Sequence, residues 1–147
     1  TSTTLISPEQ YRRYCAPHIA EYARLARSAG RTLVLHMCGH LRAILPQLRD
    51  VGAHAFEAFT SPPVGNTTLS DGRSACADVC LIGGTNAALW LKPADTIIEH
   101  LKRDFSSLPD LRGIIPSSAG VMPPAASPEK IREVCSWIHR YTAASAA

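Results

Sequence analysis

The sequence has no hydrophobic run of the roughly 20 residues that a membrane-spanning helix needs. Its N-terminus also lacks the basic region and short apolar segment of a secretory signal, so we expect a cytoplasmic protein. No basic run is present either, because the 15 Lys and Arg residues are spread along the chain. With a net charge of only +3, neither nucleic acid nor a membrane is an expected partner.

The cysteines do not form the even, closely spaced set of a small secreted domain held by disulfides. They are odd in number and scattered over segments that are expected to be helices or strands, which favours reduced thiols. The five are Cys15, Cys38, Cys76, Cys80 and Cys135. An initiator methionine is also missing at Thr1, and we therefore expect this chain to be a piece of a longer protein.

What the sequence does contain is an alternation of helix and strand signals. Ser7-Pro8-Glu9-Gln10 is typical of a helix start, because serine caps, proline suits the first position and glutamine closes a capping box. Helices are expected from Ser7 to Gly30, over 40–50, 67–76 and 93–105, and from Ser127 onward. Short apolar runs typical of buried parallel strands occupy 32–37, 54–59, 79–82 and 111–115.

This order predicts an α/β fold of four parallel strands alternating with helices, with right-handed crossovers. A (β/α)8 barrel typically needs ~250 residues, so residues 1–147 are expected to form a single domain that is the C-terminal half of such a TIM barrel. Half a barrel leaves two strand edges open, and proteins normally pair or cover such edges. We therefore expect a complementary barrel half or a homo-oligomer.

His36 and Cys38 are the first candidate site residues. They stand two apart at the end of the first predicted strand, so both side chains are expected on one face, at the rim where barrel enzymes hold their active sites. Imidazole nitrogen and thiolate sulfur suit Zn²⁺. The alternative is structural: His36 bonds to a neighbouring loop and Cys38 only packs.

Glu57 is the next candidate, because it is a lone carboxylate in an apolar strand and its unpaired burial would be costly. On strand alternation it shares a face with Ala55 and Phe59. The functional interpretation is a zinc ligand or a general base, which makes Glu57 and His36 the candidate catalytic residues. A salt bridge at the rim is the alternative.

Three loops that follow predicted strands are candidates for substrate binding, since barrel enzymes use these loops for that purpose. Asn66 ends the stiff loop SPPVGN, Gly83 and Gly84 follow the third strand, and Ser117 and Ser118 follow the fourth. Backbone amides and hydroxyls in these loops suit an anionic group. A tight turn without a ligand is the alternative for the glycine pair.

With these motifs placed, the chain resembles the C-terminal half of the uroporphyrinogen decarboxylase superfamily, which includes the cobamide-dependent methyltransferases. The resemblance follows almost the whole chain. The H-x-C-G box and the P-x3-SPE ending are its more specific parts. The segments that carry it are LISPEQYRRYCAPHIAEY, LVLHMCGHLRAILPQLRDVGAHAFEAF, VCLIGGTNAALWL and GVMPPAASPEKI.

The resemblance implies one of two chemistries on the same barrel. The H-x-C-G box favours the methyltransferase branch, in which such a His and Cys bind zinc and a later cysteine completes the site. A methyl group would then move between a small methylated substrate, or a corrinoid carried by a partner protein, and an acceptor such as a thiol. The place of the later cysteine is Ala119 here, which either removes the zinc or assigns the third position to Glu57.

The other branch decarboxylates porphyrinogen acetate side chains without a cofactor. Its catalytic arginine and aspartate lie in the N-terminal half of that enzyme, outside this sequence, and it carries a histidine near the position of Ala119. Two further interpretations are open: a half-barrel that only packs against a partner, and a binding module for a corrinoid or substrate that lacks turnover. Fold resemblance alone does not decide among them.

Overall fold

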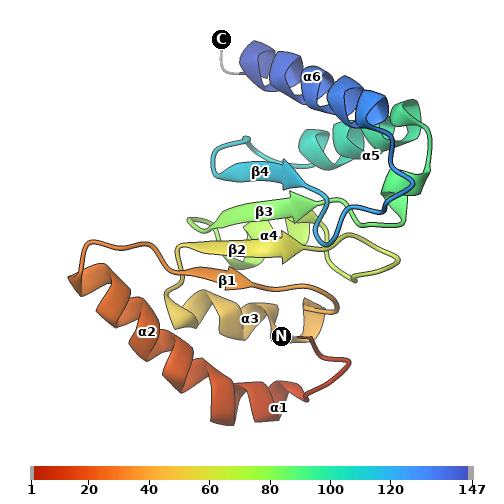
Figure 1. The fold of residues 1–147 in the computed structure, drawn as a ribbon. Helices are drawn as coiled ribbons and strands as arrows, with labels where there is room; N and C mark the ends of the chain where they lie inside the picture. Colours follow the sequence, from red (N-terminus) through yellow and green to blue (C-terminus); the bar gives the residue numbers. More distant parts are fainter. Residues whose placement is uncertain (1, 146–147) are drawn as a thin grey trace.

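Four parallel strands, each paired with its neighbour in chain order, form one sheet in the computed structural model, which describes residues 2–145 and their side chains to residue 141 (Figure 1). The strands are β1 (Val34–His36), β2 (Ala55–Phe59), β3 (Cys80–Gly84) and β4 (Ile114–Ser117). They alternate with the helices α3 (Leu45–Leu48), α4 (Leu69–Ala75), α5 (Ala94–Ser106) and α6 (Pro128–Ser145). The α/β architecture predicted from the sequence is confirmed.

The N-terminal helix contains an interruption that its sequence explains. Its parts are α1 (Pro8–Gln10), a π-helical turn (Tyr11–Cys15) and α2 (Ala16–Ser28). Ser7 caps the first turn as predicted, in a reciprocal capping box. Pro17 has no N–H, so Arg13 O receives no bond from it, and Ala16 N donates instead to Tyr11 O, five residues back. Pro17 thus changes the hydrogen-bond register of the helix at this point.

The remaining helices begin and end close to the predicted positions. The helix expected over 40–50 is irregular, with α3 standing between two 3₁₀ turns, Arg42–Ile44 and Arg49–Val51. Gly52 ends it in the left-handed conformation, at φ 71°. Thr68 caps α4, and Asp71 closes that capping box. In the described part of the chain, no helix combines the length and the apolar composition that crossing a bilayer requires.

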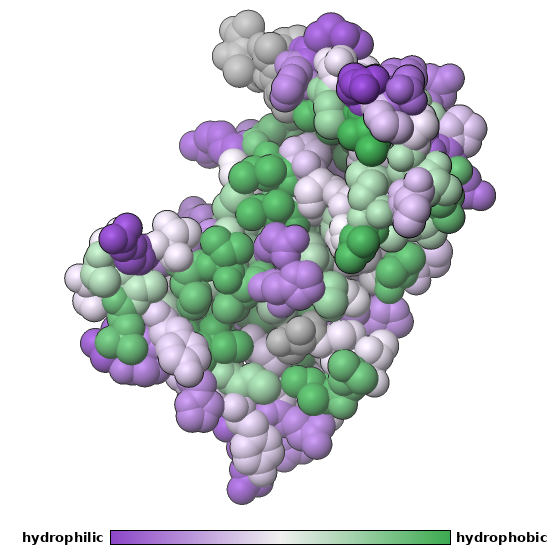
Figure 2. Space-filling view, in the orientation of Figure 1, coloured by the Kyte–Doolittle hydropathy of each residue, from purple (hydrophilic) through white to green (hydrophobic). Residues whose placement is uncertain are grey.

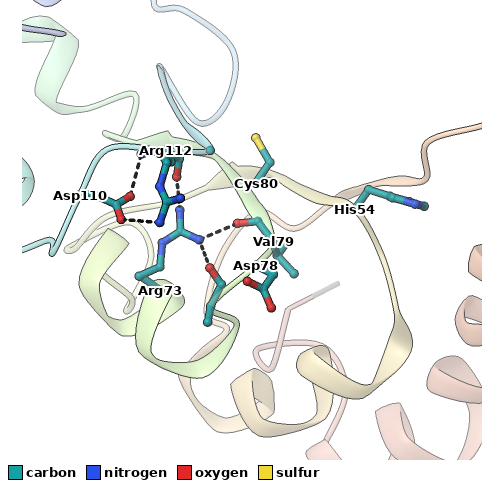
Figure 3. A pocket seen from close by; sticks show the side chains of 9 residues that line it. His54, Arg73, Asp78, Val79, Cys80, Asp110 and Arg112 are labelled. Atoms are coloured by element: carbon teal, nitrogen blue, oxygen red, sulfur yellow. Dashed lines mark hydrogen bonds and ion pairs between the residues drawn. The ribbon is translucent and has the colours of Figure 1, made fainter. Parts of the chain in front are cut away.

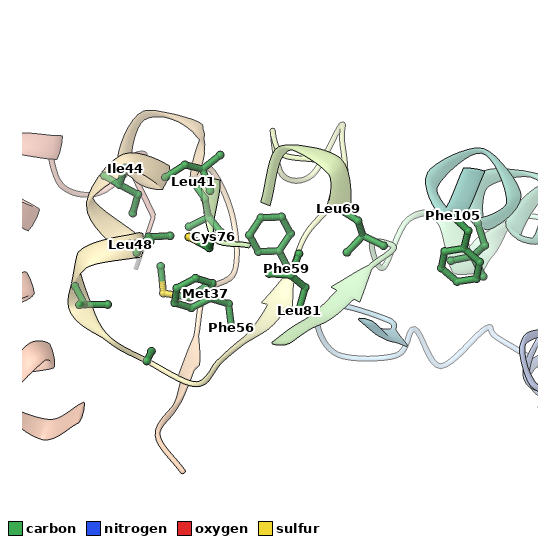
Figure 4. Close-up of a cluster of buried hydrophobic side chains, with 14 of the residues drawn as sticks. Met37, Leu41, Ile44, Leu48, Phe56, Phe59, Leu69, Cys76, Leu81 and Phe105 are labelled. Atoms are coloured by element: carbon green, nitrogen blue, oxygen red, sulfur yellow. The ribbon is translucent and has the colours of Figure 1, made fainter. Parts of the chain in front are cut away.

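A bulge near the end of β2 changes the direction of its side chains. Ala58 has φ 58°, and the pairing with β3 shifts register between Glu57 and Phe59. Phe56 and Phe59 are therefore both fully buried in the core on the helix side of the sheet, beside Leu81 (Figure 4). The expectation that Phe59 shares a face with Glu57 is wrong, because simple alternation does not continue through a bulge.

The core lies on one side of the sheet only. Side chains such as Met37, Leu48 and Phe56 fill the space between the strands and the helices behind them (Figures 1 and 4). Within residues 2–145 no helix covers the opposite face, where Val34 and Ile115 keep 47% and 50% of their surface exposed. Figure 2 looks onto this open face and shows hydrophobic residues around a small polar group.

Candidate functional site

His36 and Glu57 meet on the open face of the sheet. They are paired positions in the β1–β2 register, and His36 Nδ1 lies 2.5 Å from Glu57 Oε2. The two side chains are 61% and 39% exposed, so the contact is open to solvent. His36 ends β1 and Glu57 lies just before the bulge, which puts the pair at the carboxyl ends of these strands. This is the edge at which open α/β sheets bind ligands.

Cys38 lies on the same side of the chain as His36. Exposure alternates along this segment: Val34, His36 and Cys38 are exposed, and the intervening Met37 is 1% exposed in the core. A side-chain period of two therefore continues past the end of β1. The thiol of Cys38 is free, so it remains available as a ligand or nucleophile near the imidazole.

The turn that carries Cys38 is held by the N-terminal segment, which the sequence interpretation missed. Thr3 N donates to His40 O at 2.9 Å, and His40 N donates to Ser2 Oγ at 3.0 Å. Gly39 has φ 89°, and a Cβ there would lie 2.6 Å from Ser2 Oγ. The close approach and the positive φ explain the glycine of the H-x-C-G box, which no local pattern could have linked to Ser2.

Asn66 is engaged with the protein backbone. Its Oδ1 accepts hydrogen bonds from the amides of Leu41 (2.8 Å) and Arg42 (3.1 Å), at the start of the helical segment after β1. The Arg42 guanidinium returns a bond to Asn66 O and forms an ion pair with Asp71. These contacts join two rim loops, so Asn66 has a bracing role whether or not it also binds a substrate.

Gly83 and Gly84 are required by packing. A Cβ on Gly83, at φ 154°, would lie 2.3 Å from Phe59 O, and one on Gly84 would lie 2.8 Å from Leu69 Cδ1. His100 Nε2 is 3.0 Å from Gly84 O, and the ring nitrogen is the donor because a carbonyl can only accept. The pair thus lets β3 approach β2 closely at the rim. A role in anion binding stays a prediction.

A buried polar network behind the rim was also missed. Asn86 Nδ2 donates to Ser61 Oγ at 2.9 Å, and Thr85 Oγ1 donates to Ser117 O at 2.5 Å. Trp90 Nε1 donates to Thr85 Oγ1. Ser61, Thr85 and Asn86 are each at most 2% exposed, so these bonds satisfy groups that would otherwise be costly to bury. The signal in the sequence was the polar pair Thr85-Asn86 directly after the two glycines.

The last rim loop places Ala119 in an unusual conformation. Ala119 is 5% exposed and has φ 48°, in the left-handed region that favours glycine. Its amide donates to Ser117 Oγ at 3.3 Å, and Ser118 Oγ donates to Gly120 O at 2.6 Å. Both candidate serines therefore have intraloop partners. The backbone is therefore tightly specified at the position that the resemblance assigns to the later cysteine of the methyltransferases.

Comparisons with known proteins agree with the half-barrel fold. The family model described as uroporphyrinogen decarboxylase (URO-D) matches residues 1–141. The chain belongs to the uroporphyrinogen decarboxylase family. The solved structure of a methyltransferase from Methanosarcina mazei is similar, with a TM-score of 0.75 at 19% sequence identity, over 95% of this chain.

The match covers 39% of the methyltransferase chain, so this sequence spans well under half the length of that relative. At this identity the likeness shows the fold, and a half-barrel is what the coverage indicates. No curated protein matches the sequence. The matches thus show a partial barrel of the uroporphyrinogen decarboxylase family with a methyltransferase among its structural neighbours.

The side chains at the rim that could bind a metal ion are of types that zinc prefers, but they are few. Within residues 2–145 no three His, Cys, Asp or Glu side chains converge on one point. Cys38 supplies a thiol, and His36 supplies an imidazole whose Nδ1 faces the Glu57 carboxylate. A ligating histidine commonly donates its second ring N–H to a carboxylate in this way. Two donors of this chain thus fit Zn²⁺, and further ligands must come from elsewhere.

A separate pocket of about 300 Å³ lies at the opposite end of the strands (Figure 3). Arg73 crosses it and donates to the carbonyls of Ala77, Val79 and Arg112, which ties α4 to the starts of β3 and β4. Burial raises the pKa of the Cys80 thiol there, partly offset by Arg73. Conserved chemistry in barrels lies at the other end, so we assign this pocket to stability.

Proposed function

We propose that this chain forms the catalytic rim of a methyltransferase of the uroporphyrinogen decarboxylase family, which moves a methyl group between a corrinoid or a small methylated substrate and an acceptor such as a thiol. The observation that carries the proposal is the His36–Glu57 contact with Cys38 beside it, on the open face at the carboxyl ends of β1 and β2. The similar fold of the M. mazei methyltransferase supports it. The cytoplasmic location expected from the sequence belongs to the same proposal.

Glu57 sets which nitrogen of His36 reacts. An ionised carboxylate only accepts hydrogen bonds, so the 2.5 Å contact requires the proton to be on Nδ1. In the neutral ring, Nε2 is then left with a free lone pair for a metal ion or a substrate proton. The sequence predicted Glu57 as a third zinc ligand. In this arrangement its carboxylate instead accepts the His36 Nδ1 proton and so orients the imidazole.

Zn²⁺ would be held by His36 Nε2 and Cys38 Sγ, with the remaining positions taken by water, by the acceptor or by ligands from outside this chain. Glu57 is bonded to Nδ1 on the other edge of the ring, so it would orient His36 and would not bind the ion itself. The ion supplies Lewis acidity that makes a coordinating thiol a thiolate at neutral pH. Ala119 offers no donor at the place of the later cysteine, so this site is more open than one with three protein ligands. An open position is what distinguishes catalytic from structural zinc sites.

The corrinoid enters as a substrate carried by a partner protein. In the proposed transfer, the bond from the methyl carbon to cobalt breaks and a bond to the acceptor sulfur forms, while the electron pair of the broken bond stays on cobalt. With an O-methyl donor, the bond from the methyl carbon to oxygen breaks as the methyl group passes to the acceptor, and the leaving oxygen would take a proton from Glu57 or His36 in its protonated form. The backbone amides of Gly83 and Gly84 and the hydroxyls of Ser117 and Ser118 are proposed to contact the substrate.

Decarboxylation of a porphyrinogen is the second candidate, and the His36–Glu57 pair favours it. The His36–Glu57 pair can handle a proton without a metal ion, which is what a cofactor-free reaction needs. His36 in its protonated form, held by Glu57 through Nδ1, is suited to deliver from Nε2 the proton that replaces carbon dioxide on the substrate carbon. The activity of either kind belongs to the whole protein, including parts outside this chain.

Metal analysis of the full-length protein tests the first candidate. We expect stoichiometric zinc in the unmodified protein and its loss in His36→Ala and in Cys38→Ser. Two matched controls, His18→Ala and Cys135→Ser, remove an exposed histidine and an exposed thiol away from the rim and should keep the metal. Transfer from methylcobalamin to a thiol, followed by the visible spectrum of the corrinoid, should fail in the same two rim variants.

Different outcomes separate the candidates. Zinc-free protein that releases carbon dioxide from uroporphyrinogen, and loses this activity in His36→Ala, would replace methyl transfer by decarboxylation. Zinc retained in both rim variants would remove the metal from this site. Full activity of both kinds in the rim variants would refute a catalytic role for the His36–Glu57 pair altogether.

A further inference from the structure

Two titratable side chains lie on the core-facing side of α5. The buried residues of this helix are Ile97, Leu101 and Phe105, the last of which is seen in the core in Figure 4. His100 and Asp104 fall on the same face by helical spacing, and their side chains are only 18% and 14% exposed. A carboxylate is rarely buried without a partner. The His36–Glu57 pair lies on the other face of the sheet, so these two side chains need a separate explanation.

His100 donates a hydrogen bond to the carbonyl of Gly84, at the end of β3. The distance from Nε2 to Gly84 O is 3.0 Å, and Nε2 carries the proton because a carbonyl only accepts. Asp104 Oδ2 lies 3.6 Å from the same nitrogen, which is beyond hydrogen-bond range. The proton on Nε2 is therefore directed to Gly84 O, and the burial of both side chains leaves the imidazole little room to turn.

This bond restrains a part of the backbone that glycine leaves free. Gly83 and Gly84 have φ 154° and 86°, and close packing excludes a side chain at either position. Glycine has the widest range of backbone conformations, so packing that requires a glycine pair also weakens control over the direction of its peptide groups. His100 restores that control. Because the peptide is trans, a Gly84 carbonyl that points to α5 directs the Thr85 N–H away from α5.

The restraint extends from β3 to the next rim loop. Thr85 Oγ1 donates to Ser117 O at 2.5 Å and accepts a bond of 2.9 Å from Trp90 Nε1. Thr85 is 1% exposed, so solvent offers its hydroxyl no alternative partner. The loop after β4 thus takes its position from Thr85, and Thr85 takes its own from the Gly84 peptide group. These are the two loops that are proposed above to contact the substrate.

We propose that His100 is a positioning residue for substrate binding, which fixes the Gly84 carbonyl and, through Thr85, holds the β3 and β4 rim loops in the arrangement that receives an anionic part of the substrate. The proposal rests on the proposed function in that these loops contact the substrate. His100 lies on the helix side of the sheet, so it acts only through the backbone. Without its bond, a smaller fraction of the loop conformations can bind, and the apparent affinity falls by that fraction. Loss of one ordinary hydrogen bond should weaken binding about 2- to 10-fold.

Three variants of the full-length protein separate positioning from stability. His100→Leu removes the donor and keeps an apolar side chain in the core. His100→Gln places an amide N–H near the position of Nε2 and should restore the bond. His54→Leu is the matched control, because His54 Nδ1 accepts a bond of the same length, 3.0 Å, from Leu33 N at the opposite end of the strands. Both leucine variants lose one bond between a histidine and the backbone.

Hydrogen exchange followed by mass spectrometry measures the rim backbone directly. His100→Leu should speed exchange in residues 83–91 and 115–121, His100→Gln should return it toward the unmodified rate, and His54→Leu should leave both segments unchanged. Steady-state kinetics is the second measurement, either with methylcobalamin and mercaptoacetate or with uroporphyrinogen. His100→Leu should raise KM about 2- to 10-fold with little change in kcat, because the substrate and the transition state lose the same contacts.

The two measurements distinguish failure of this proposal from failure of the proposed function. Unchanged exchange of the rim segments in His100→Leu, or equal loosening of them in His54→Leu, would overturn the positioning role. Equal loosening in His100→Gln and His100→Leu would do the same, and so would faster exchange with an unchanged KM. Faster rim exchange in His100→Leu, in a protein that turns over in neither assay, would support control of the loops by His100 and refute the proposed function.

Discussion

Replacing Gly83 with alanine is expected to destabilise the fold by about 2–6 kcal/mol, from two separable causes. The first is conformational: φ 154° is a value that residues with a side chain rarely adopt, and holding alanine there costs about 1–3 kcal/mol. The second is steric. A Cβ at this position would lie 2.3 Å from Phe59 O and 2.7 Å from Phe59 N, and these are backbone atoms at the β2 bulge that cannot rotate away.

Gly120→Ala is the matched control. Gly120 has φ 144°, but an added Cβ would meet nothing within 4 Å, so this variant carries the conformational cost without the collision. The difference between the two variants isolates the steric cost, for which overpacking data give about 1–3 kcal/mol. Urea denaturation followed by far-ultraviolet circular dichroism measures both free energies of unfolding, provided that the slope against urea stays constant.

The result that would refute this reasoning is a Gly83→Ala variant as stable as Gly120→Ala. It would mean that β2 and β3 separate at the rim without cost. The close approach of Gly83 to Phe59 would then not be a constraint on the strand ends that hold Glu57. A substrate-binding role would be left as the explanation for the glycine pair.

Three further outcomes are expected. Burial raises the pKa of Asp104 above its ordinary value, so its contribution to stability is present at low pH and is lost as pH rises through the raised pKa. Asp104→Asn should therefore gain stability relative to the unmodified protein as pH rises above the ordinary carboxyl range in urea titrations, and a difference that stays constant with pH would contradict this. Burial raises the pKa of Tyr11 to about 12, so its ionisation should change the absorbance at 295 nm near that pH. Tyr11→Phe should remove this change, and a titration identical to that of the unmodified protein would show that Tyr11 does not cause it. Burial also raises the pKa of the Cys76 thiol, so a maleimide at neutral pH should label the exposed Cys38 well before Cys76. Peptide mass mapping can follow the order of labelling, and labelling of Cys76 first would contradict the structure.

The sequence by itself determined the order of helices and strands and the side of β1 on which the reactive groups lie. Apolar runs separated by capping and stop signals predicted four β/α units, and all four strands are observed in chain order. Because side chains alternate along a strand, the spacing of His36 and Cys38 predicted that both lie on one side, and both are exposed in the structure. These features depend on residues that are neighbours in the chain, whose spacing fixes direction directly.

Tertiary structure alone decided how those groups are partnered. His36 and Glu57 are 21 residues apart, and their contact follows from the pairing register of β1 and β2, which no local pattern specifies. The bulge at Ala58 sends Phe59 into the core against simple alternation, and Asn66 is bonded to the Leu41 amide because two rim loops meet. Contacts between distant segments depend on how the strands align and the loops close, so the fold was readable in the sequence while the site's hydrogen bonds required the assembled sheet.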